Sequence, residues 1–315
     1  MNGKGKCALS ACCILSKRGM GIKMKTEIIF EDKDILVAYK PAGLATQTAR
    51  VGQQDMVSEL KNYLWQKRMI TGAALGRPAP YLGVIHRLDQ PVEGLLVFAL
   101  NAKAAGALTE QLQEQGQTGV QESGQTTMQE QGQTGMQESG QTAMQKQGQI
   151  GKQGPEGTEA QGKRGMLHKK YYGVVCGKPD REEEELVDYL YKNKENRAVI
   201  VEDSGKAEGD FPAKKAVLKY HVLQVTERPQ PLTLVDIHIF TGRFHQIRAQ
   251  MAHRGMPLLG DMKYGGESAK ASAKALYIPD VALCAYSLEF VHPGTGREIG
   301  FQIKPKGRAF SFFSQ

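Results

Sequence analysis

Two segments far apart in the sequence place charged side chains at the edge of apolar elements. The first segment, His86–Asp89, precedes the apolar run Gly94–Ala99. An acid in such a position is either paired with a cation or strongly shifted in pKa, because an unpaired buried charge is unfavourable. The second segment, Gly242–Arg248, supplies two candidate cations, Arg243 and Arg248. Together the two segments contain the residue types of an active site built around one carboxylate.

The residue patterns around these segments predict a mixed α/β body. Apolar runs predict strands at 28–30, 35–39, 171–176, 216–225, 232–240, 281–291 and 299–303. Helical spacing and capping signals predict helices at 55–68, 102–112 and 244–254. Several strands without crossover helices favour an α+β fold with a mixed sheet over a doubly wound fold. The four consecutive acids at Glu182–Glu185 are expected in a solvated loop.

A low-complexity repeat interrupts this body. Residues 113–152 repeat with a period of eight, and no aromatic residue occurs between Phe98 and Tyr171. Each unit offers about one large apolar side chain, which cannot offset the ordering entropy of so much Gln and Gly. We therefore predict that residues 113–165 form a disordered insertion that the function does not need.

The charge of the chain favours a polyanionic partner. The formal net charge is +8, and residues 111–165 carry four basic and six acidic residues, so the rest of the chain is the basic part. Nucleic acid is the first candidate for such a basic body, and an anionic membrane is the second. No run reaches the length of a transmembrane helix, so no membrane partner is expected.

The cysteines and the N-terminus indicate a reducing, cytoplasmic setting. Three of the five cysteines lie in the first 13 residues, and no Cys-x-x-Cys pair suggests a zinc ribbon or a disulfide framework. The N-terminal apolar stretch is short and lacks a small-residue cleavage site. We interpret residues 1–25 as a disordered extension, or as the result of a start codon placed before Met24.

The order of motifs along the chain resembles the RluA family of RNA pseudouridine synthases. The resemblance rests on five ordered segments, namely Lys40–Leu44, His86–Asp89 with Gly94–Leu96, Lys169–Gly177, Gly242–Arg248, and Pro257–Asp261 with Tyr264–Gly265. It implies one catalytic domain made of residues 26–112 and 166–306, with a tail at 307–315. It also implies a mixed, mostly antiparallel sheet with flanking helices.

This resemblance implies an isomerase that converts uridine to pseudouridine in structured RNA, either ribosomal or transfer RNA. No metal and no cofactor are expected, and a monomer is favoured. By resemblance Asp89 is the catalytic carboxylate, Arg243 its cationic partner and Tyr171 the aromatic residue that stacks on the uracil. Tyr172 is the alternative to Tyr171, because a slip of one residue exchanges the two faces of a strand.

The same resemblance assigns residues to the RNA. Arg87 is expected to fill the space that a flipped uridine leaves or to grip the flipped nucleotide. Four further side chains are expected to contact phosphates at the rim of the pocket, namely His245, Arg248, Arg254 and Lys263. One departure concerns the segment after the acid. Val92 and Glu93 stand where the family commonly has Thr and Ser, and Glu93 is expected to add a negative charge near the RNA.

Two other functions compete with this interpretation. An inactive RNA-binding protein of the same fold is suggested by Val92 and Glu93, although Asp89 and Tyr171 are intact. A metal-dependent phosphoesterase would draw its ligands from scattered residues, namely His86, Asp89, His245, His253 and Asp261. No His-x-His or His-Glu-x-x-His spacing groups these residues into a binding unit, so the sequence favours the isomerase.

Overall fold

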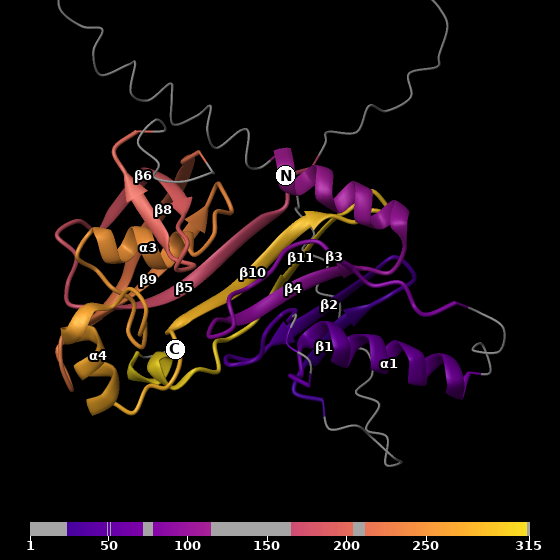
Figure 1. The fold of residues 1–315 in the computed structure, drawn as a ribbon, viewed down its shortest axis with the longest axis horizontal. Helices are drawn as coiled ribbons and strands as arrows, with labels where there is room; N and C mark the ends of the chain where they lie inside the picture. Colours follow the sequence, from indigo (N-terminus) through magenta and orange to yellow (C-terminus); the bar gives the residue numbers. More distant parts are fainter. Residues whose placement is uncertain are drawn as a thin grey trace, which may run out of the picture.

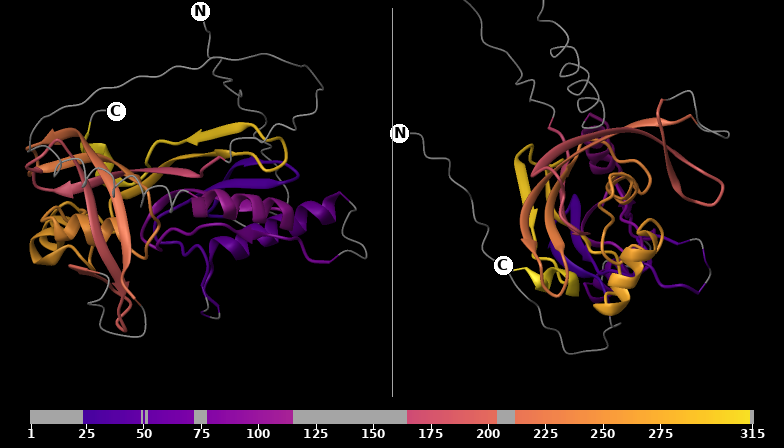
Figure 2. Two further views of the ribbon diagram at one scale, coloured as in Figure 1. Left: turned by 90° about the horizontal axis from the view of Figure 1, so that it is seen from above. Right: turned by 90° about the vertical axis from the view of Figure 1, so that its left-hand side faces the viewer.

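The computed structural model describes residues 24–48, 50, 52–71, 78–114, 165–203 and 212–313. Most of the predicted N-terminal extension and of the predicted insertion at 113–165 lie outside the described residues. The described residues form one mixed, mostly antiparallel sheet with flanking helices, which confirms the expected α+β class. Figure 2 shows the strands as one curved layer.

Eleven strands make up the sheet, in the order β1-β2-β4-β10-β5-β9-β8-β6-β7, with β3 paired to β4 and β11 paired to β10. Their bounds are β1 Glu27–Glu31, β2 Ile35–Lys40, β3 Gly83–Val84, β4 Glu93–Ala99, β5 His168–Cys176, β6 Glu183–Lys192, β7 Ala198–Val201, β8 Lys214–Thr226, β9 Leu232–Ile239, β10 Leu283–Val291 and β11 Glu298–Gln302. The central strands β2 and β4 are buried along their whole length, because helices or loops cover both of their faces.

The two halves of the sheet meet at a short parallel junction between β4 and β10. Only Glu93 with Cys284 and Gly94 with Ala285 are in register there. Gly94 has a φ of +133°, and a Cβ at this position would lie 2.5 Å from the backbone nitrogen and oxygen of Ala285. Glycine is therefore required for the close approach of the two strands. The junction fixes the start of β4, and thus the loop before it, relative to the C-terminal half.

The helices cover the sheet at separate places. They are α1 (Met56–Ile70), a helix at 102–114, α3 (Gln246–His253), α4 (Gly266–Ala275) and the 3₁₀ helix η1 (Arg308–Phe312). In Figure 1, α1 and α3 lie towards opposite ends of the sheet. Both helices nevertheless contribute to the same large apolar core, α1 through Leu60 and α3 through Met251, and Tyr171 belongs to it. The helix at 102–114 packs in a different core, through Ala104 and Leu108.

Two parts of the chain differ from the sequence prediction. Glu183–Lys192 is strand β6 rather than a solvated loop, because Glu183 pairs across the sheet with Lys219 of β8 at 3.1 Å and Leu186 on the other face is buried. Residues 307–313, the described part of the segment predicted as a tail, pack against the domain. Phe310 and Phe313 of this segment are buried in a core with Val174 and Cys284.

The structure also contains elements that were not predicted from the sequence, among them β3, β7, α4 and η1. Within the described residues, no helix combines the length and the apolar character that a membrane span requires.

Candidate active site

The loop that carries Asp89 is fastened by a buried lysine. The Nζ of Lys40, a fully buried residue, donates to the carbonyl oxygens of Leu44 at 2.6 Å, Gln90 at 3.0 Å and Pro41 at 3.1 Å. Burial lowers the pKa of Lys40 to about 7, although the charge of Asp89 acts in the opposite direction. Lys40 thus joins the turn after β2 to the residue next to Asp89, so the predicted Lys40–Leu44 segment positions the acid.

Asp89 forms one end of a chain of charges that runs into the core. Nη1 of Arg248 lies 3.0 Å from Oδ2 of Asp89, while Nε and Nη2 of Arg248 donate to both oxygens of Asp261 at 2.7 and 2.8 Å. The side chain of Asp89 is 25% exposed, that of Arg248 is 6% exposed and that of Asp261 is 1% exposed. Solvent therefore reaches only the Asp89 end of the chain.

The two buried members of this chain hold each other in the charged state. Burial would raise the pKa of Asp261, but Arg248 and the backbone N–H groups of Tyr264 and Lys263 hold it below its usual value. Burial would lower the pKa of Arg248, but the hydrogen bonds and the charge of Asp261, together with Asp89, raise it. Arg248 thus presents a permanent positive charge to Asp89 at neutral pH.

Arg243 is not the partner of Asp89, contrary to the prediction. Its Nε donates to the carbonyl oxygen of Lys215 at 2.9 Å, and its backbone N–H donates to Oε1 of Gln246. The helix geometry explains the exchange of roles. Arg248 lies within the buried first turns of α3, whereas Arg243 lies in the turn before α3 and its Nε reaches the backbone of β8. The partner of Asp89 lies in the predicted segment Gly242–Arg248, but it is Arg248 and not Arg243.

His245 lies beside Asp89 in a strained backbone conformation. Its φ is +52°, in the left-handed region, and its Nε2 lies 3.5 Å from Oδ2 of Asp89. The hydroxyl of Tyr264 accepts from the N–H of Ala198 at 2.7 Å and lies 2.8 Å from Nδ1 of His245. Burial lowers the pKa of His245 to about 4. A neutral ring that accepts the Tyr264 proton at Nδ1 directs its Nε2–H towards Asp89.

The strand register distinguishes the two adjacent tyrosines. Tyr171 is buried in the same core as Leu88, and burial together with the charge of Asp89 raises its pKa. Tyr172 points to the opposite face of β5, where its ring stacks on that of Tyr286 with a centroid distance of 3.7 Å. Tyr171 is therefore the tyrosine on the face of Asp89.

The remaining predicted RNA-binding residues lie at different distances from this centre. Arg87 is exposed next to the buried Leu88. Lys263 lies two residues after Asp261, and its Nζ donates to the carbonyl oxygen of Asn196. Arg254 lies at the far end of α3, where its Nη2 is 3.6 Å from Asp188. The structure therefore brings Lys263 to the centre and places Arg254 more than one helical turn beyond Arg248.

Glu93 does not add a negative charge to the site, contrary to the expectation. Its side chain is buried and accepts hydrogen bonds from the hydroxyl of Tyr39 and from the backbone N–H groups of Lys306 at 3.2 Å and Gly307 at 2.8 Å. The residue therefore fastens the C-terminal segment to the start of β4. The difference from the family pattern at this position is structural.

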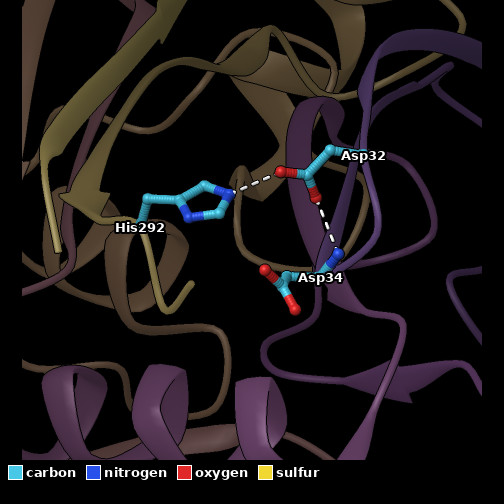
Figure 3. Close-up of side chains that lie close together, drawn as sticks. All are labelled: Asp32, Asp34 and His292. Carbon is cyan, nitrogen blue, oxygen red and sulfur yellow. Dashed lines mark hydrogen bonds and ion pairs between the residues drawn. The ribbon is translucent and has the colours of Figure 1, made fainter. Parts of the chain in front are cut away.

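Among the described residues, one group of acidic and imidazole side chains has the spacing of a metal site, and Figure 3 shows its members Asp32, Asp34 and His292. Nε2 of His292 lies 2.7 Å from Oδ2 of Asp32, and Nδ1 of His292 accepts from the N–H groups of Gly294 and Thr295. Both ring nitrogens are already used, so the imidazole has no lone pair left for a metal. This group fastens a turn, and His86, His253 and Asp261 are not part of it.

Three residues important for the geometry are absent from the predicted site. Lys40 and Tyr264 belong to motifs that the sequence analysis noted, and Asp261 ends another such motif. The role of Asp261 could have been suspected from its position at the end of an apolar run, because an acid in such a position needs a cation. Nothing in the sequence shows that this cation is Arg248, because the pair forms only when α3 packs against the loop at 260–264.

Comparison with known proteins agrees with this geometry. A family model described as RNA pseudouridylate synthase matches residues 34–119 and 157–253. The chain is 28% identical over 280 residues to the uncharacterized RNA pseudouridine synthase YlyB of Bacillus subtilis, covering 89% of this chain and 69% of that protein. It is 27% identical over 271 residues to the dual-specificity RNA pseudouridine synthase RluA of Vibrio parahaemolyticus, covering 85% and 78%.

A further relative is ribosomal large subunit pseudouridine synthase D of Pseudomonas aeruginosa, 30% identical over 280 residues, covering 87% of this chain and 66% of that protein. Among solved structures, human RNA pseudouridylate synthase domain containing 1 superposes with a TM-score of 0.58 at 17% identity, covering 91% of this chain and 86% of that chain. At this identity the likeness concerns the fold.

Proposed function

The chain belongs to the RNA pseudouridylate synthase family and is an isomerase of uridine in RNA, and we propose that Asp89 is the carboxylate that carries out this reaction. The observation that supports the assignment is the contact between Asp89 and Arg248. In this contact a partly exposed carboxylate is paired with a buried, permanently charged guanidinium. The net positive charge of the protein in turn suits a polyanionic substrate.

The reaction breaks the bond between N1 of uracil and C1′ of ribose and forms a bond between C5 and C1′. The hydrogen on C5 leaves as a proton, and N1 gains one, so the product is an isomer of the substrate. A carboxylate serves this exchange as a nucleophile or as a stabiliser of the positive charge that develops on the sugar. Both routes use a carboxylate at this position, and Nη1 of Arg248 lies 3.0 Å from Oδ2 of Asp89.

Tyr171, Arg87 and His245 complete the proposed machinery. Tyr171 lies on the same face as Asp89 and offers a ring for the uracil to stack on. The exposed Arg87, two residues before Asp89, is suited to fill the gap that the flipped uridine leaves. His245, neutral at physiological pH, limits the rotation of Asp89 through its Nε2.

We propose structured ribosomal or transfer RNA as the substrate and the cytoplasm as the place of reaction. Two relatives have names that refer to the ribosomal large subunit or to dual specificity, which supports RNA of these classes. The reaction we propose transfers no phosphoryl group and changes no oxidation state, so these residues alone can provide its acid–base and electrostatic needs.

Tritium release tests this function. Unmodified transcripts of bacterial ribosomal and transfer RNA carrying [5-³H]uridine are incubated with the protein, with and without EDTA. Release in both conditions is expected, because bond formation at C5 expels the label. No release from any transcript would contradict the activity, and release that EDTA abolishes would favour a metal enzyme.

The inactive RNA-binding protein is the weaker candidate. Its support was the substitution of Thr and Ser by Val92 and Glu93, and Glu93 is buried away from the site against Lys306 and Gly307. Glu93 therefore does not remove the active-site arrangement around Asp89, which the inactive-protein interpretation would require.

A further inference from the structure

A groove lies next to the catalytic carboxylate and is separate from it. It has a volume of about 310 Å³, and its walls include Arg197, Arg248, Lys263, Pro91, Met262 and Pro279. Arg248 connects the groove to the active site, because its Nη1 contacts Asp89. A molecule bound in the groove would thus be separated from Asp89 by the guanidinium group of Arg248.

One wall of the groove is cationic. Nη2 of Arg197 donates to the carbonyl oxygen of Lys263 at 2.7 Å, and Nζ of Lys263 donates to the carbonyl oxygen of Asn196. These reciprocal bonds fasten the turn between β6 and β7 to the loop after Asp261. Among the described residues, no carboxylate pairs with Arg197 or Lys263 in an ion bridge, so both keep donor capacity for an anion.

The other wall is apolar. The side chain of Met262 is 61% exposed, although it lies between the buried Asp261 and Lys263. Pro91 and Pro279 stand beside it in the groove. Exposed methionine and proline surfaces of this kind are favourable partners for the flat face of a nucleobase, and they do not discriminate strongly between bases.

We propose that this groove is a subsite for the nucleotide that adjoins the target uridine in the RNA. Its phosphate binds Arg197 and Lys263, and its base packs on Met262, Pro91 and Pro279. The opposite character of the two walls matches the two parts of one nucleotide, and the position beside Arg248 matches a neighbour of the flipped residue. This inference rests on the proposed function, since it takes RNA as the substrate.

Arg197→Gln tests the cationic wall. A synthetic RNA stem-loop around a uridine that the wild type converts to pseudouridine is the substrate and the binding probe. The slope of log Kd against log [KCl] is expected to fall by about 0.7 to 0.9, the value for one phosphate contact. KM is expected to rise about tenfold at 0.15 M KCl with kcat within twofold. Arg197→Lys, which keeps the charge, restores the slope.

Arg297→Gln is the matched control, because Arg297 is an exposed arginine in the turn between β10 and β11. Its slope and KM are expected to equal those of the wild type. An Arg197→Gln slope equal to that of Arg297→Gln would overturn the phosphate contact, and so would an Arg197→Lys variant as weak as Arg197→Gln.

Met262→Ala tests the apolar wall together with two substrates that carry an abasic residue on the 5′ or the 3′ side of the uridine. The wild type is expected to lose three- to tenfold in kcat/KM on one of the two abasic substrates. Met262→Ala loses a similar factor on the intact RNA and nothing further on that abasic substrate. If Met262→Ala lowered kcat/KM on both abasic substrates by the same factor as on the intact RNA, the base contact would be overturned.

These outcomes are separable from failure of the proposed function. A wild type that forms no pseudouridine refutes the function, and the slopes are then measured with an unmodified bacterial ribosomal RNA transcript as the probe. A wild type that forms pseudouridine with all variants unchanged refutes the subsite alone.

Discussion

Arg248 contacts Asp89 across 159 residues of sequence, with Nη1 3.0 Å from Oδ2. The same guanidinium is held from behind by Asp261, which is 1% exposed and bonded to two backbone N–H groups. The position of the catalytic carboxylate therefore depends on a cation that is itself fixed in the core. This relationship makes Arg248 a structural and an electrostatic element at once.

Arg248→Ala is expected to lower the free energy of unfolding by about 3–5 kcal/mol, because it leaves Asp261 charged and buried without a partner. Arg243→Ala removes one hydrogen bond from a half-buried side chain and is expected to cost about 1 kcal/mol. Urea unfolding at pH 7 compares the two. Equal losses would show that the charged chain does not stabilise the fold in this way.

The adjacent tyrosines offer a matched pair. Tyr171→Phe keeps the ring but removes a hydroxyl on the face of Asp89, and it is expected to reduce kcat by roughly 10² or more through loss of a proton-transfer group. Tyr172→Phe keeps its stacking on Tyr286 from the opposite face of β5 and is expected to stay within twofold. Single-turnover pseudouridine formation measures both. A larger loss of kcat in Tyr172→Phe than in Tyr171→Phe would place the reacting uridine on the other face of the sheet.

The sequence identified a large part of this arrangement, and the reasons differ from residue to residue. The pairing of Asp89 with a cation was predictable because an acid beside apolar runs needs one, whereas its catalytic role was predicted only from the resemblance to the RluA family. The helix at 55–68 was predictable because Val57, Leu60 and Leu64 recur at helical spacing, and Asp55 caps its start by accepting from the N–H of Ser58.

Contacts between distant segments were not predictable. The choice between Arg243, in the turn before α3, and Arg248, within α3, depends on how this segment packs against the loop at 89–92, and the local sequence allows either. The role of Glu93 depends on Lys306 and Gly307, more than two hundred residues later. The acids at the start of β6 suggested a loop because the strands that pair with them lie elsewhere in the chain; Glu183, for example, pairs with Lys219 of β8.

His245 predicts a pH dependence of stability. Its pKa is about 4 in the folded protein and 6.5 in the unfolded chain. Between these values the unfolded chain binds a proton that the folded protein does not, so stability is lost as the pH falls from 6.5 to 4. The loss assigned to His245 is about 3 kcal/mol.

His245→Asn isolates this contribution, because asparagine tolerates the left-handed backbone and does not titrate. We subtract the free energy of unfolding of the variant from that of the wild type. This difference is expected to fall by up to about 3 kcal/mol as the pH is lowered from 6.5 to 4. Burial also lowers the pKa values of His86 and His238. Both residues are present in the wild type and in the variant, so their effect on the pH dependence of stability cancels in the difference. A difference that does not change with pH would contradict the assignment.

Glu93→Gln is expected to lower the free energy of unfolding by about 1.5–3 kcal/mol, because an amide cannot accept all the hydrogen bonds from Tyr39, Lys306 and Gly307. The kcat for pseudouridine formation is expected to stay within twofold. Glu289→Gln, at an exposed position of β10, serves as the control and is expected to be neutral. A drop in kcat with an unchanged free energy of unfolding would show that Glu93 acts in the active site and not in holding the C-terminal segment.

The central claim is that Asp89 carries the chemistry, and the most direct test compares the wild type with Asp89→Asn under single-turnover conditions. Pseudouridine formation and RNA affinity are measured on the same transcript, with excess protein. We expect the variant to bind RNA within threefold of the wild type and to form no detectable pseudouridine. Product formation by Asp89→Asn at the wild-type rate would contradict the account.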